Sequence, residues 1–133
     1  MIFKENDGFE YDFCVTEEKY YLFIALSEDK NPLHTDEEFA KSKGFRGRVM
    51  HGNILNSVLS YFVGECLPIK NVVIHAQEIQ FKKPVYLNDH LILKIKVKGV
   101  FESVQAVEFG FTFINSMTND TLAKGKLQIG ILL

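Results

Sequence analysis

The residues best suited to acid/base chemistry are Asp29 and His34, which lie five positions apart on either side of the dipeptide Asn31-Pro32. Proline fixes the backbone of such a turn, and a turn can direct both side chains into one cleft. Histidine titrates near neutral pH, and a neighbouring carboxylate can orient the imidazole or a water molecule. The pair is a candidate general acid and base, although Asp and His beside a proline turn are also common as loop residues without a catalytic role.

A second candidate feature follows, where the segment Gly47–Gly52 leads into a long apolar stretch. The first backbone N–H groups of a helix have no partner within the helix, and they can stabilise negative charge that develops on a substrate. Gly52 has no side chain, so an oxygen atom could approach its amide closely. The alternative is that Gly52 is only a helix cap and that His51 packs in the interior.

The sequence pattern predicts the elements that must hold these residues. Over Gly52–Cys66, apolar residues recur at every third or fourth position, which predicts a long buried helix. Thr16 can cap a shorter helix that ends before Asn31-Pro32, and a helical turn over Asp36–Ser42 should stop at Gly44. From Val72 onward the period falls to two, and strands are predicted over Val72–Phe81, Leu91–Lys98, Val104–Asn115 and Leu122–Leu132.

One long apolar helix beside several antiparallel strands indicates an α+β fold, in which a curved sheet wraps around a central helix. Along Leu91–Lys98 one face is apolar, and the other carries Lys94, Lys96 and Lys98, which predicts a solvated outer face. With 133 residues and 47% hydrophobic content, the chain can form one core, so we expect a single domain over residues 1–133. A small sheet also leaves an exposed edge, which favours a homodimer.

Composition and charge argue against several classes of protein. The net charge of −2 is unlike that of a nucleic-acid-binding protein. No stretch approaches the roughly 20 apolar residues of a membrane span, and no secretory signal is predicted. Cys14 and Cys66 are far apart, so we expect no disulfide and a cytoplasmic location. His75 and His90 have no carboxylate or cysteine at ligand spacing, and we expect neither a metal nor a cofactor.

Two segments carry a resemblance to a known family. Ser27–His34 reads S-E-D-K-N-P-L-H, and Val49–Leu55 reads V-M-H-G-N-I-L. Together they resemble the signature of the MaoC-like, (R)-specific enoyl-CoA hydratases of the hot-dog fold, in which S-x-D-x-N-P-x-H precedes a hydrophobic-H-G turn. The similarity continues through Leu59-Ser60 and Phe81–Tyr86 and covers most of the chain beyond about residue 20. It implies one MaoC-like hot-dog domain over residues 1–133.

The resemblance also implies a reaction and the residues that perform it. The reaction is the reversible addition of water to a trans-2-enoyl thioester, carried by coenzyme A or an acyl carrier protein, to give the (R)-3-hydroxyacyl product. Asp29 and His34 would bind the catalytic water, and the Gly52 amide would form the oxyanion hole. Ser60 matches a serine that supports the site in the family, and we name Asn31, His51 and Ser60 as candidate supporting residues.

Two positions depart from the family pattern. Asn88 stands where glycine usually precedes Asp89, and asparagine tolerates the left-handed conformation that this turn requires. Asn53 replaces a commonly apolar residue directly after Gly52, which leaves the substrate preference open. Basic residues near these motifs could meet the phosphates of a pantetheine carrier, although ordinary surface charge is the alternative. They are Arg46, Arg48, Lys82 and Lys83, and we name Asn53, Arg48 and Lys82 as candidate substrate-binding residues.

Two other functions remain open. A hot-dog acyl thioesterase would need an acid on or near the central helix, where Glu65, at the far end, is the only one. A non-catalytic acyl-thioester-binding module would keep the fold without the chemistry, and the intact set of Asp29, His34 and Gly52 argues against it.

Overall fold

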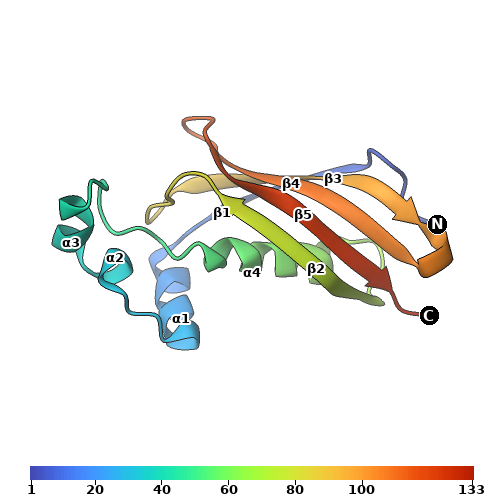
Figure 1. The fold of residues 1–133 in the computed structure, drawn as a ribbon, viewed down its shortest axis with the longest axis horizontal. Coiled ribbons are helices and arrows are strands. Elements are labelled where there is room, and N and C mark those ends of the chain that lie inside the picture. Colours follow the sequence, from blue (N-terminus) through green and yellow to red (C-terminus); the bar gives the residue numbers. More distant parts are fainter.

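The computed structural model describes residues 1–133, and its largest feature is one antiparallel sheet (Figure 1). The strand order is β1-β3-β4-β5-β2, and every neighbouring pair is antiparallel. The predicted α+β class and the antiparallel sheet are therefore confirmed. The strands are β1 (Gly8–Cys14), β2 (Val72–Phe81), β3 (His90–Phe101), β4 (Ala106–Asn115) and β5 (Thr121–Ile131).

The central helix α4 (Asn53–Tyr61) begins directly after Gly52 and ends in a π-helical turn, Phe62–Cys66. Figure 1 shows that it runs along one face of the curved sheet. Leu59 and Phe62 are completely buried there, so the predicted buried helix over Gly52–Cys66 is confirmed. None of the helices is long and apolar enough to cross a membrane.

The core lies between α4 and the inner face of the sheet. In β3, alternate side chains point inward and are buried, while the lysines between them are exposed, as the period of two predicts. The Phe62 ring of the helix meets Phe9 and Phe109 of the sheet edge-on, at centroid distances of 5.3 and 5.4 Å. Edge-to-face contacts of this kind add to the hydrophobic gain of burying large rings, and they fix the π-helical turn after α4 against β1 and β4.

Three parts of the chain differ from the sequence-based prediction. The edge strand β1 was not predicted, because its pairing with β3, such as Phe9 opposite Ile95, joins segments far apart in the sequence. Strand β4 begins later than Val104, because the preceding residues form a 3-10 turn that ends at a left-handed Gln105 (φ 51°). Helix α2 (Pro32–Thr35) occupies a segment that we expected to be only a turn.

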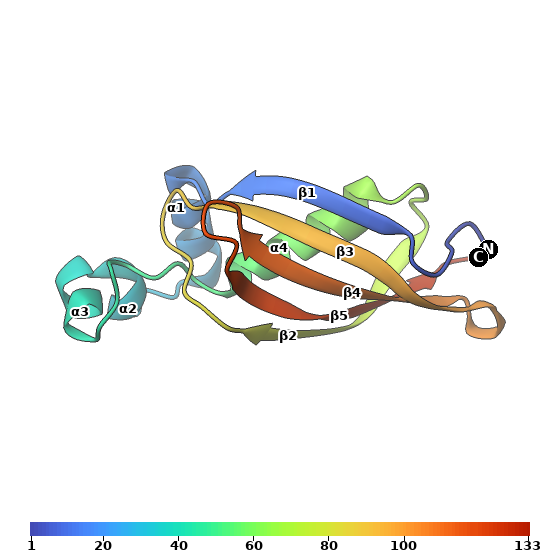
Figure 2. The same cartoon turned by 90° about the horizontal axis from the view of Figure 1, so that it is seen from above.

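Three short helices lie together at one end of the sheet, beside the start of α4, whereas both chain termini lie at the opposite end (Figure 2). Besides α2 they are α1 (Glu17–Ser27) and α3 (Glu37–Ser42). Thr16 caps α1 and Asp36 caps α3, each with its side chain accepting a backbone N–H, and the left-handed Gly44 (φ 92°) follows α3. These predicted boundaries are confirmed, and this end of the molecule holds the candidate site.

The contact between β5 and β2 gives a test of the packing. A Cβ atom added at Gly125 would overlap the backbone carbonyl oxygen of Glu78, so β2 would have to move. We expect Gly125→Ala to lower the free energy of unfolding by about 2–3 kcal/mol, as overpacking does, in urea denaturation. Gly64→Ala is the control, because a Cβ there would meet nothing within 4 Å. Equal stability of the two variants would contradict the close packing.

Candidate active site

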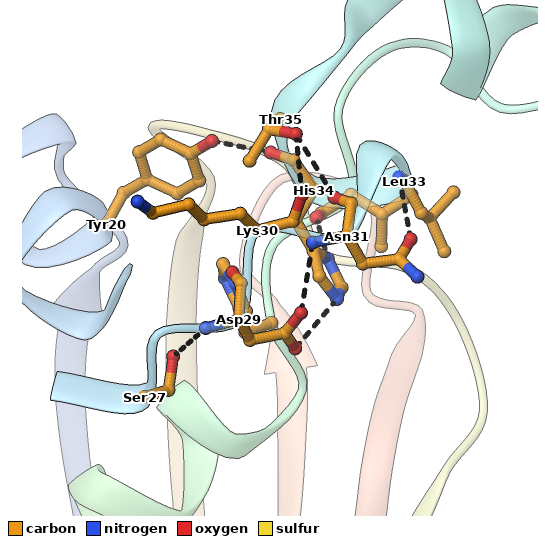
Figure 3. Close-up of polar contacts among 10 residues, drawn as sticks. Tyr20, Ser27, Asp29, Lys30, Asn31, Leu33, His34 and Thr35 are labelled. Atoms are coloured by element: carbon orange, nitrogen blue, oxygen red, sulfur yellow. Dashed lines mark hydrogen bonds and ion pairs between the residues drawn. The ribbon is translucent and has the colours of Figure 1, made fainter. Parts of the chain in front are cut away.

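The side chains of Asp29 and His34 converge at this end of the molecule (Figure 3). The distance between Asp29 Oδ2 and His34 Nε2 is 3.6 Å. Asp29 lies in the loop after α1 with 46% of its side chain exposed, and His34 lies in α2 with 16% exposed. A carboxylate and an imidazole at this separation can both hydrogen-bond to one water molecule that lies beside the pair, which is the arrangement that acid/base chemistry needs.

Local hydrogen bonds hold the Asp29 carboxylate in this position. Its Oδ1 atom accepts a hydrogen bond from the Asn31 backbone N–H (3.1 Å), and the Asp29 N–H donates to Ser27 Oγ (3.2 Å). Asn31 in turn caps α2, since its side-chain oxygen accepts from the Leu33 N–H (2.9 Å). One carboxylate oxygen of Asp29 is thus engaged by the loop, and the other faces His34.

The protonation of the His34 ring follows from its hydrogen bond to the backbone. His34 Nδ1 lies 2.7 Å from the Val49 carbonyl oxygen, and a carbonyl only accepts, so Nδ1 carries the hydrogen. In the neutral ring, Nε2 is then unprotonated and faces Asp29. The buried Tyr20 hydroxyl donates to the His34 carbonyl oxygen (2.5 Å) and ties α2 to α1. His34 Nε2 is therefore the atom that can take a proton.

His51 lies directly behind this pair. Its side chain is buried, and its ring stacks on the His34 ring at a centroid distance of 3.9 Å and an interplanar angle of 26°. His51 Nε2 lies 2.9 Å from the carbonyl oxygen of Asp29. The His51 side chain thus packs in the interior, which is one of the two alternatives that the sequence left open. Its ring also contacts both members of the Asp29–His34 pair.

A cavity of about 460 Å³ opens in front of Asp29 and His34. Its lining combines these two polar side chains and Gly52 with apolar side chains, among them Phe23 and Phe81. Asp29 is the only acid that lines it. A mostly apolar cavity with a few converging polar groups suits a ligand that has one reactive polar group and an apolar remainder.

Gly52 lies on the wall of this cavity, immediately before α4. Its N–H donates to no other group of the chain, as expected for a residue before the first helical turn. The ring of Phe81, at the end of β2, covers the glycine so closely that an added Cβ would lie 2.8 Å from it. The cavity thus holds an acid/base pair and an available backbone donor together.

Three of the predicted residues do not line the cavity: Asn31, which acts as the cap of α2, and Ser60 and Arg48, which lie away from it. Ser60 is exposed and does not line it, because eight residues of helix carry it about 12 Å along the axis of α4 from Gly52. Arg48 turns toward Tyr20, with its guanidinium 5.1 Å from the ring centroid and Nη1 3.5 Å from the hydroxyl. Within one chain, these two side chains are therefore not brought to the site.

The other basic candidates differ in whether they are already paired. Arg46 lies 4.2 Å from the Tyr86 ring centroid and 3.5 Å from a carboxylate oxygen of Asp89. Lys83 lines the cavity but donates to Asp120 (2.9 Å), and this hydrogen bond lowers the pKa of Asp120 below its ordinary value. Lys82 also lines the cavity, is exposed and has no acidic partner. It is the basic side chain that remains free to meet an anionic substrate.

Phe23 and Phe81 line the cavity, and the sequence analysis missed both. Phe23 lies in α1 and contacts His51, with 4.9 Å between the ring centroids. Neither residue carries a local signal, because their place at the cavity depends on how α1 and the end of β2 pack around the start of α4. Asn53, the candidate substrate-binding residue that follows Gly52 directly, also lines the cavity.

An antiparallel sheet wrapped around one central helix defines a protein of the hot-dog fold. A solved structure of an (R)-hydratase from Aeromonas caviae involved in PHA biosynthesis has this fold. It superposes on the chain with a TM-score of 0.89 and 25% identity, covering 98% of both chains.

The profile of the MaoC-like domain family matches residues 3–114, and the chain belongs to this family. It is 39% identical over 80 residues to an (R)-specific enoyl-CoA hydratase of Aeromonas caviae, a match that spans 60% of this chain and 60% of that protein. It is 30% identical over 109 residues to an (R)-specific enoyl-CoA hydratase of Rhodospirillum rubrum, spanning 82% of this chain and 76% of the relative.

Proposed function

We propose that the chain hydrates trans-2-enoyl thioesters to (R)-3-hydroxyacyl thioesters and catalyses the reverse dehydration, with residues 1–133 acting as one catalytic domain. The observation that carries the proposal is the convergence of Asp29, His34 and the free N–H of Gly52 on one cavity. The two relatives named as (R)-specific enoyl-CoA hydratases support the same reaction. The substrate carrier would be coenzyme A or an acyl carrier protein.

The mechanism follows from the atoms that face the cavity. Asp29 Oδ2 and His34 Nε2 hold one water molecule, and Nε2 takes a proton as the water oxygen bonds to C3 of the enoyl group. The C2=C3 electron pair moves toward the carbonyl, and the Gly52 N–H donates to the negative oxygen. The protonated Nε2 then gives its proton to C2, so that one water molecule is added. Dehydration runs through the same steps in reverse.

An assay with crotonyl-CoA tests the reaction. Hydration removes the ultraviolet absorbance of the enoyl thioester without releasing a free thiol, and this is the result that we expect. Release of a free thiol would show a thioesterase instead, although Asp29 is the only acid at the cavity and Glu65 is exposed at the far end of the helix. If neither signal changes while the thioester binds, the chain is a binding module.

The contribution of Lys82 can be measured separately from the chemistry. An exposed lysine near a phosphate is worth up to about 1 kcal/mol, so we expect Lys82→Ala to raise KM for crotonyl-CoA by roughly 3- to 5-fold with kcat unchanged. Because salt screens exposed charges, the difference should shrink at high ionic strength. Lys94→Ala, on the outer face of the sheet, is the control. Equal KM values for the two variants would remove Lys82 from the substrate site.

We also propose that the protein is a homodimer in the cytoplasm. Strand β2 lies at the edge of the sheet and pairs only with β5, and exposed strand edges favour pairing with another chain. Apolar side chains on or near this edge are exposed, including Val73 (42%) and Phe81 (52%). The unpaired Cys14 and Cys66 fit a reducing compartment. Sedimentation equilibrium tests the assembly, and a monomer at micromolar concentration would contradict it.

A further inference from the structure

His51 takes no part in the proposed hydration steps, although its side chain has unusual surroundings. Only 3% of it is exposed, and it is the one polar or charged side chain among the buried residues. Its ring stacks on His34 and contacts Phe23 on another side. Its Nδ1 atom is buried without any hydrogen-bond partner. A buried polar atom without a partner is costly and calls for a physical reason.

The hydrogen bond from His51 to Asp29 fixes the position of its proton. The Asp29 carbonyl oxygen only accepts, so His51 Nε2 carries the hydrogen and donates it over 2.9 Å. In the neutral ring Nδ1 then holds a lone pair. A second proton on Nδ1 would create a buried N–H without an acceptor and a buried charge against the His34 ring. The surroundings therefore favour one neutral form of His51.

The same hydrogen bond connects the Asp29 loop to the interior. The other hydrogen bonds of Asp29 go to Ser27, the last residue of α1, and to Asn31 in the loop that follows, and both residues are exposed. His51 is thus the side chain that ties the Asp29 backbone to the core, while its ring supports one face of His34. A shift of His51 would change the 3.6 Å separation between the two side chains of the pair.

We propose that His51 is a positioning residue that holds Asp29 and His34 at their working separation and stays neutral while His34 carries the proton taken from water. This inference rests on the proposed hydration. When His34 becomes positively charged, the neutral ring stacked on it can interact favourably with the charge, whereas a second charged ring would repel it. The proton that His34 takes from water can then pass only to C2 of the substrate and not to His51.

Two variants separate the parts of this role. His51→Phe keeps a stacked ring but removes the donor to Asp29, and His51→Gln keeps a donor but removes the ring. We expect kcat to fall roughly 10- to 100-fold in His51→Phe, the size of a small misplacement of catalytic groups, and His51→Gln to recover part of that loss. Binding of butyryl-CoA, a saturated analogue that cannot be hydrated, should stay within about 3-fold of the parent in both, since neither change alters the Gly52 amide.

His90→Phe is the matched control, because His90 is exposed at the start of β3, away from the β2 edge, and does not line the cavity. We expect its kcat to equal that of the parent. Parental kcat in a folded His51→Phe variant would overturn the proposal. A second result would also overturn it: a lower melting temperature together with a loss of butyryl-CoA binding as many-fold as the loss of kcat. That pattern describes a purely structural residue.

A spectroscopic measurement tests the proposal without using activity. In ¹⁵N-histidine-labelled protein at pH 8, the nitrogen shifts report which ring atom carries the hydrogen. We expect His51 in the Nε2–H form and His34 in the Nδ1–H form. The opposite form of His51 would overturn the inference even in an active enzyme. If the parent shows the expected forms but does not hydrate crotonyl-CoA, the proposed reaction fails while the hydrogen bond of His51 to Asp29 stands.

Discussion

Asp29→Asn and His34→Ala should each lower kcat for hydration of crotonyl-CoA by at least ~100-fold, the size of a general acid/base effect. Asn keeps the size of Asp29 and can still accept from the Asn31 N–H, but it loses the charge that polarises water. Ala removes the Nε2 atom that takes the proton. Because the two side chains act on one water molecule, the double variant should be little worse than the worse single variant.

This interpretation requires that the variants fold. Neither residue belongs to the buried hydrophobic core, so neither substitution leaves a core cavity of the kind that costs several kcal/mol. Circular dichroism and thermal melting should therefore match the parent, as they should for Glu38→Gln, an exposed control in α3. Near-parental turnover in either well-folded single variant would disprove the mechanism.

Gly52→Ala should also lower kcat about 100-fold or more, comparable to removing an oxyanion donor. The backbone of Gly52 is already helical (φ −57°, ψ −34°), so alanine introduces no conformational strain. The added Cβ would instead lie 2.8 Å from the Phe81 ring, at the cavity wall where the thioester oxygen must approach the N–H. We expect a folded protein whose backbone donor is obstructed.

The double variant Gly52→Ala, Phe81→Ala distinguishes two explanations for that loss. If alanine acts only by displacing the Phe81 ring, the double variant should be as active as Phe81→Ala alone. If the Cβ itself obstructs the amide, activity stays low even after the ring is removed, and this is the result that we expect. Steady-state kinetics with crotonyl-CoA for the four proteins complete the comparison.

The central helix and four of the five strands were predictable because their apolar residues follow the periods of a buried helix and of a half-buried strand. Strand β1 was missed although Phe9, Tyr11 and Phe13 alternate with polar residues, because a short edge strand becomes apparent only when its partner is known. Helix α2 was missed because four residues are too few to show a helical period.

The candidate site was predictable where it is local in the sequence. Asp29 and His34 flank one turn, and Gly52 precedes the central helix, so each could be recognised from a short segment. Phe81 could not, because the end of β2 meets the start of α4 only through packing of the whole sheet. Ser60 came from the family resemblance, and a single chain leaves it exposed, away from the cavity.

The two stacked imidazoles both take their orientation from main-chain carbonyl groups, those of Val49 and Asp29. A carbonyl is present at every position whatever the residue type, so mutation of Val49 cannot delete the acceptor that His34 needs. The Val49 segment is itself held by main-chain pairing with Tyr86 and Leu33. Substitutions at the residues that supply these carbonyls therefore leave the acceptors of both imidazole N–H groups in place. The side chains that line the cavity can change, and alter which substrates fit, without changing which ring nitrogen carries the hydrogen.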